Sequence, residues 1–244
     1  MRLARYGDSH KSQIEIVELP IVGYLFPHSY IQCIYVATVL RSGGKEMYWN
    51  MPQYQIARDK AEEILKMINY DPEEMIRTND IIKAVEEKLN VDVKFTKFNF
   101  DALESNGKRS ALAQCGAMMC VSNRQEGRKA AILLNQKETP EMVRFSLVHE
   151  LGHLVTLDWD TLGPCHVSMH IDMDITSISQ ELLENPKYGY LVNEQIANIF
   201  ALLVLIPYDS LMKAILKYKS LEAVADFFGV EKNAVVSRLM LENK

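Results

Sequence analysis

The feature that most constrains this chain is an H-E-x-x-H pattern, His149–His153, in a stretch whose apolar residues indicate a buried helix. His149 and His153 are four residues apart, so on an α-helix both imidazoles leave the same face and can reach one metal ion. Glu150 lies about 100° round the helix, where a carboxylate can take a proton from an attacking water. The pattern therefore predicts a catalytic zinc site with Glu150 as the general base.

The residues before the motif indicate where its helix begins. Thr139 suits the N-cap position, Pro140 the first helical position and Glu141 an acidic first turn. The apolar residues that follow form a broad surface, so the polar groups of the motif are embedded in a core. An alternative stays open: the two histidines are simply hydrogen-bonded in a core helix, and Glu150 is solvated or paired.

A catalytic zinc site needs a third protein ligand and an open fourth position. The metzincin pattern does not continue here, because Thr156 and Trp159 stand where its glycine and third histidine would be. Asp158 and Asp160 follow the motif closely and are possible ligands. The third ligand must come from them or from a more distant segment.

The better candidate for the third ligand is Glu194. It opens a second apolar run with helical spacing, which stops at Pro207. Asn198 lies one turn further along the same face, as expected of an amide that orients a metal ligand from behind. The alternative role for Glu194 is an exposed residue of the first turn that complements the helix dipole.

Two stretches of the chain resemble a known family. Arg144–His153 (RFSLVHELGH) and Glu194–Ala201 (EQIANIFA), with a helix ending at Pro207, are similar to the ImmA/IrrE family of bacterial and phage metallopeptidases. The similarity covers roughly residues 53–208, and the tail more weakly. It implies a gluzincin-like zinc endopeptidase. Family members cut helix-turn-helix repressors of a mobile element, prophage or stress regulon, so a repressor is the implied protein substrate.

The resemblance also implies a role for individual residues. It assigns His149, His153 and Glu194 as the ligands of Zn²⁺ and Glu150 as the general base. Two parts of the chain depart from the family pattern. The connection 158–193 is longer than expected and is a candidate lid or exosite, and residues 1–52 have no recognised counterpart.

The group that stabilises the oxyanion is not identified by the sequence. Four residues are candidates by position only: Tyr188, Tyr190, His166 and His170. For each of them an ordinary packed or surface role is the main alternative. Cys165 or Cys115 as a removable fourth zinc ligand is a further possibility, because thiolate binds zinc well.

Composition favours a cytoplasmic protein. The chain has 244 residues, 48% of them hydrophobic, and a formal net charge of -5. No segment is expected to span a membrane, and no signal peptide is expected. The four cysteines form no C-x-x-C pair, which indicates free thiols in a reducing compartment.

The order of elements predicts an α+β fold in three parts. A β-rich N-terminal extension covers 1–52, a domain with a small twisted sheet packed on the motif helix covers 53–208, and a helix-turn-helix-like tail covers 209–244. The family resemblance implies that the domain of residues 53–208 is a zincin-like metallopeptidase. The other expected helices and strands are Gln55–Asn69, Asp80–Leu89 capped by Asn79 or Asp80, Val91–Phe95, Gly116–Ser122 and Ala130–Leu134.

The strand at Ala130–Leu134 leads almost directly into the motif helix. We expect it to border the cleft, where an extended substrate can pair with an exposed strand edge. The alternative is a buried strand with both edges already paired, which its apolar composition also fits.

The tail supports a second class of function. Ser220–Val230 followed by Lys232–Leu241 has the spacing of a helix-turn-helix, so a non-catalytic regulator that binds DNA or a repressor is the alternative to an enzyme. Residues 209–244 hold six Lys or Arg and five Asp or Glu, a net charge of +1. The second helix offers only Lys232 and Arg238 to phosphates. Direct nucleic-acid binding is therefore not expected.

Overall fold

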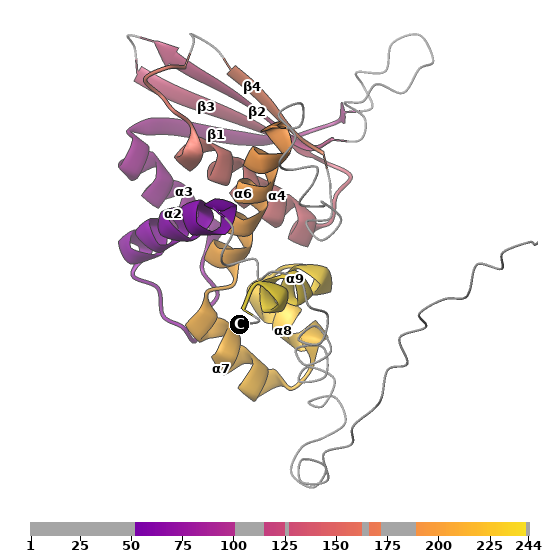
Figure 1. Cartoon of the computed structure of the whole chain (residues 1–244). Coiled ribbons are helices and arrows are strands. Elements are labelled where there is room, and N and C mark those ends of the chain that lie inside the picture. Colours follow the sequence, from indigo (N-terminus) through magenta and orange to yellow (C-terminus); the bar gives the residue numbers. More distant parts are fainter. Residues whose placement is uncertain (1–51, 101–114, 125–126, 163–165, 172–188, 243–244) are drawn as a thin grey trace, which may run out of the picture.

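The computed structural model describes residues 52–100, 115–124, 127–162, 166–171 and 189–242. Within these ranges the fold is α+β, as predicted, with helices packed on a small sheet (Figure 1). The predicted N-terminal extension lies outside the described residues except for Pro52. Most of the connection 158–193 also lies outside them.

The sheet has four strands in the order β1-β3-β2-β4. They are β1 Val91–Phe98, β2 Cys115–Arg124, β3 Gly127–Asn135 and β4 His166–Ile171. β1 runs parallel to β3, whereas β2 is antiparallel to both β3 and β4. Alternate side chains of β3, such as Ala130 and Ile132, are buried, so one face of the sheet meets the helices.

The expectation that β3 forms an exposed edge was wrong. Its residues pair with β1 on one side and with β2 on the other, as in the register Phe95–Ile132–Met119. The alternative, a buried strand with both edges paired, is what the structure has. The strands at the edges of the described sheet are β1 and β4.

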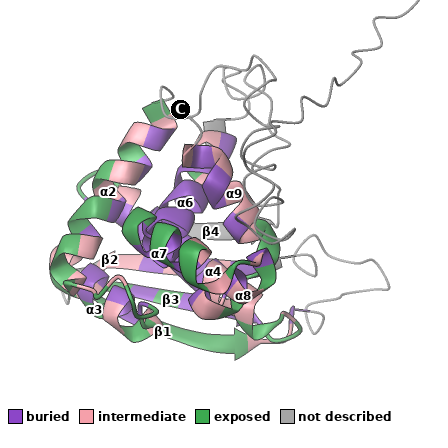
Figure 2. Ribbon diagram, turned by 90° about the horizontal axis from the view of Figure 1, so that it is seen from below, coloured by how far each residue is buried: buried purple, intermediate pink, exposed green. Residues whose placement is uncertain are grey.

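Seven helices lie among the described residues, and Figure 2 shows them in front of the sheet. They are α2 Pro52–Ile68, α3 Thr78–Leu89, α4 Pro140–Thr156, α6 Gly189–Leu205, α7 Tyr208–Tyr218, α8 Leu221–Phe228 and α9 Lys232–Glu242. The predicted start of α4 is confirmed, because Oγ1 of Thr139 accepts a hydrogen bond from the backbone N–H of Met142 at 3.2 Å. No single described helix is long and apolar enough to cross a membrane, although the bent pair α6 and α7 meets that test jointly.

The predicted cap of α3 was wrong. Arg77 occupies the N-cap position and makes no side-chain capping bond. Its carbonyl already accepts a hydrogen bond from the backbone N–H of Asp80 at 3.0 Å, so Asp80 lies inside the first turn. The hydroxyl of Thr78 instead accepts a hydrogen bond from Arg144 of α4 at 2.6 Å.

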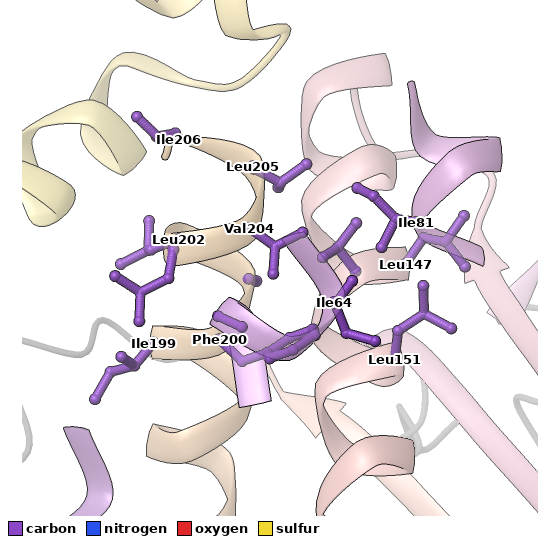
Figure 3. Packing of buried hydrophobic residues seen from close by; sticks show 14 of the residues in the cluster. Ile64, Ile81, Leu147, Leu151, Ile199, Phe200, Leu202, Val204, Leu205 and Ile206 are labelled. Atoms are coloured by element: carbon purple, nitrogen blue, oxygen red, sulfur yellow. The ribbon is translucent and has the colours of Figure 1, made fainter. Parts of the chain in front are cut away.

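The central packing contact joins α4 and α6. Every residue of Ser146–Val155 and of 195–206 is buried. Figure 3 shows Ile64 of α2 and Leu151 of α4 beside Phe200 of α6. This apolar packing surrounds the polar residues of the H-E-x-x-H motif and holds the two helices in a fixed relation.

Gly152 permits α4 and α6 to approach closely. A Cβ atom at this position would lie 3.0 Å from the Cα of Ala197 and 3.0 Å from Cδ1 of Phe200. The first of these atoms belongs to the backbone, which cannot rotate away as a flexible side chain can. The absence of a side chain at residue 152 therefore sets the distance between the two helices.

The predicted helical tail is present as α7, α8 and α9. Gly229, with φ of 60°, ends α8, and its N–H bonds to the carbonyls of Ala225 and Asp226. Val224 of α8 and Val235 of α9 belong to the same hydrophobic cluster as the core of α4 and α6. The tail is therefore packed onto the rest of the described chain.

We predict that Gly152→Ala lowers the free energy of unfolding by about 1–3 kcal/mol, because the new methyl group forces the backbones of α4 and α6 apart. Urea denaturation measures the change. In an unhindered helix the same substitution is stabilising by about 1 kcal/mol. A Gly152→Ala protein as stable as the original would therefore contradict the close contact.

Candidate metal centre

Two helices bring three potential metal ligands together. α4 carries His149 and His153, and α6 carries Glu194. The Nε2 atoms of the two histidines lie 3.0 Å apart. Oε2 of Glu194 lies 3.3 Å from Nε2 of His149, and Oε1 lies 3.2 Å from Nε2 of His153. This group, which is buried or nearly so, can hold a metal ion.

The spacing of these atoms suits a small cation. Nitrogen and oxygen ligands of a tetrahedral zinc stand about 2.0–2.2 Å from the metal, and therefore about 3.3–3.5 Å from one another. The two histidine nitrogens lie 3.0 Å apart, and the Glu194 carboxylate reaches one of them with each of its two oxygens, at 3.3 and 3.2 Å, so the separations are close to this range. A helix with two histidines in an ordinary core would not need a carboxylate from another helix within reach of both rings.

Asn198 orients His149 from behind. The Nδ1–H of His149 donates to Oδ1 of Asn198 at 2.8 Å, and both side chains are buried. With its proton on Nδ1, the ring presents the lone pair of Nε2 to the site. The structure therefore places Asn198 in the predicted position, one turn after Glu194.

His153 has a raised pKa. Burial alone would lower the pKa, since a charged imidazolium loses hydration. The hydrogen bond to Glu194, together with the negative charges of Glu194 and Glu150, outweighs burial and raises the pKa above its ordinary value. The site therefore has an excess of negative charge that attracts a cation.

Glu150 is fully buried next to His149 on α4. Its negative charge contributes to the raised pKa of His153, so the carboxylate lies in the neighbourhood of that ring. It is not itself a member of the group whose ligand atoms converge. A carboxylate beside a metal site, rather than in it, is suited to proton transfer.

Two alternatives from the sequence are not supported at this site. Asp158 and Asp160 are exposed, and Asp160 forms an ion pair with Arg128 at 3.8 Å, away from the converging group. The proposed first-turn role of Glu194 was wrong. α6 begins at Gly189, so Glu194 lies in its second turn, and its side chain is only 16% exposed.

Other sequence candidates cannot be placed. Tyr188 and Cys165 lie outside the described residues. His166 and His170 lie in β4 and Tyr190 lies in α6, but their side chains, like that of Cys115, are not among those described. The close contact at Gly152 was not predicted, although a glycine in the interior of an apolar helix is a signal of close packing.

No family model and no curated protein matches the chain. The case for a metal centre therefore rests on the geometry of α4 and α6.

We predict that Asn198→Ala lowers zinc affinity by roughly 10–100-fold, because His149 loses the group that orients its ring. Competition titration with a zinc indicator measures the affinity. Asn198→Asp should restore much of it, since a carboxylate also accepts the Nδ1–H bond. Equal affinity in the Ala variant and the original protein would remove this role from Asn198.

We predict that Glu194→Ala weakens zinc binding severely, because two of the three protein ligands remain. Metal content per chain, measured by emission spectroscopy, tests this. Asp160→Ala is the matched control, since it removes an exposed carboxylate outside the group, and it should bind zinc normally. Full zinc occupancy in Glu194→Ala would place the third ligand elsewhere.

Proposed function

We propose that the protein is a zinc-dependent endopeptidase that hydrolyses peptide bonds in a protein substrate in the cytoplasm. One observation carries this proposal: two imidazole nitrogens and a carboxylate converge within 3.0–3.3 Å beside the buried Glu150. In this arrangement the two histidines of the motif can bind a metal ion, and its glutamate can transfer a proton.

The donor set favours zinc over harder cations. Two imidazoles and one carboxylate match catalytic zinc sites, whereas Ca²⁺ and Mg²⁺ prefer oxygen ligands. Structural zinc sites usually have four protein ligands. Among the described residues the converging group supplies three, His149, His153 and Glu194, which fits a site that keeps one position for water or substrate.

Glu150 and Asn198 complete the proposed chemistry. When bound, zinc lowers the pKa of water and polarises the scissile carbonyl. Glu150 accepts a proton from the attacking water and passes it to the leaving amine. Asn198 holds His149 in the tautomer that leaves Nε2 available.

The resemblance to ImmA/IrrE metallopeptidases suggests a helix-turn-helix repressor of a mobile element, prophage or stress regulon as the substrate. A substrate must lie extended to reach the site, and main-chain pairing with a strand edge is a common way to hold it. Since both edges of β3 are paired, we expect the substrate to pair with one of the edge strands, β1 or β4. Co-expression with a repressor encoded nearby, followed by a search for fragments, tests the choice of substrate.

The alternative function is DNA binding through the tail, and the charged side chains of the tail do not favour it. Arg238 is only 2% exposed, and Lys232 pairs with Glu222 at 2.8 Å. These are the two cations of α9, which would be the helix that reads a duplex. A helix with one cation buried and the other ion-paired suits packing or a protein partner better than phosphate contacts.

We predict that Glu150→Gln keeps the fold and the zinc but lowers peptide cleavage by at least 10²–10⁴-fold, roughly the contribution of a general base. Cleavage of the target is followed by gel electrophoresis, with metal content measured in parallel. The amide has the same size as the carboxylate but cannot accept the proton. Unchanged turnover would rule out this role, and a zinc-binding protein that never cleaves would favour the regulator.

A further inference from the structure

A second site lies away from the metal centre, between α2, α6, α7 and α9. It is a cavity of about 280 Å³. The lining combines tyrosines, two arginines, three carboxylates and apolar side chains. Its residues are Tyr54, Arg58, Ala61, Glu62, Leu65, Tyr70, Leu203, Pro207, Tyr208, Asp209, Arg238 and Glu242. Along α6, Leu203 is nine residues from Glu194, a separation of roughly 14 Å at 1.5 Å per residue.

Arg238 is one of the buried residues that line this cavity. It is only 2% exposed; its Nε donates to the carbonyl of Ile206 at 2.9 Å, and its Nη1 donates to Glu242. Its Nη2 has no hydrogen-bond partner among the described residues. This nitrogen is not one of the fully buried polar atoms that lack a partner, so part of its surface is open. Because Arg238 lines the cavity, this nitrogen is available to a ligand there.

Tyr54 supplies a second free donor. Tyr54 is 7% exposed. Its hydroxyl has no hydrogen-bond partner within the described part of the chain, and it is not among the fully buried polar atoms. Burial and the negative charge of Glu242 raise its pKa. The hydroxyl therefore stays protonated at neutral pH and can donate a hydrogen bond to an acceptor in the cavity.

The remaining walls offer an apolar surface and a negative charge. Leu65 and Leu203 line the cavity, and Asp209 stands exposed at its margin. Arg238 is paired with Glu242, and Arg58 lies 3.1 Å from Asp59 and 3.7 Å from Glu62, so neither arginine adds an unpaired positive charge to the lining. Asp209 has no ion-pair partner in the described ranges, and it leaves the lining with one excess negative charge.

We propose that this cavity binds a small zwitterion of the α-amino acid class with an apolar side chain. The carboxylate accepts hydrogen bonds from Arg238 and Tyr54, the ammonium group faces Asp209, and the side chain lies against Leu203. A simple anion would satisfy the two donors but would add to the excess negative charge. A zwitterion satisfies the donors and also meets Asp209 with a positive charge.

Isothermal titration of the full chain with L-leucine tests this assignment. We expect saturable binding with one site per chain. Tyr54→Phe should weaken it roughly 10-fold or more, the usual effect of losing a hydrogen bond to a charged group. Tyr218→Phe is the matched control, because Tyr218 packs against Phe227 outside the cavity, and it should bind as the original does.

Two further compounds test the contributions of the carboxylate and the ammonium group one at a time. 4-Methylpentanoate lacks the ammonium group and leucinamide lacks the carboxylate, so both should bind more weakly than L-leucine. Asp209→Asn should weaken L-leucine but not 4-methylpentanoate. Binding by 4-methylpentanoate as tight as that of L-leucine would overturn the zwitterion assignment.

The metal centre must be excluded as the source of the signal. L-leucine binding should persist in Glu194→Ala, which disables the metal group and leaves the cavity intact. Loss of binding in that variant, equal binding by Tyr54→Phe and Tyr218→Phe, or no saturable heat up to about 10 mM ligand would each overturn the proposal.

Discussion

The contact between α4 and α6 at Gly152 is the constraint on which the rest of the site depends. Packed helices usually keep their axes 8–10 Å apart because side chains separate them. At Gly152 the backbone of α4 meets that of α6 at Ala197. Gly152 is next to His153, and Ala197 lies between Glu194 and Asn198. The position that sets the helix separation is therefore also the position around which the three potential metal ligands are arranged.

This arrangement buries a polar cluster in the most apolar part of the molecule. His149, Glu150 and Asn198 are each 3% exposed or less, although polar groups lose hydration free energy when buried. The hydrogen bonds between the helices offset part of that loss, and a bound cation would offset more while stabilising the folded state. Rigid apolar surroundings hold the three side chains in place, so a cation that bound there would require little further ordering of the protein.

The local parts of the site could be predicted from sequence, and the non-local parts could not. The helix cap at Thr139 and the shared face of His149 and His153 follow from spacing along one helix. Glu194 was predicted from its residue pattern and a family resemblance, and the structure brings it beside the two histidines. The pairing of β3 on both edges depends on strand order, which short-range patterns do not encode. The cavity at Arg238 needed four helices to converge, so no single segment carried a signal for it.

Burial changes which role Arg238 can have, because a buried guanidinium cannot contact a DNA phosphate. In the sequence it is one of two cations on a helix that could read DNA, but in the structure it joins α9 to α6. A buried guanidinium must be paired, and Arg238 meets this need with Glu242 on its own helix and the carbonyl of Ile206 at the end of α6. The same helix carries Glu194. The bond from Arg238 to Ile206 therefore ties the tail to the helix that brings Glu194 to the two histidines.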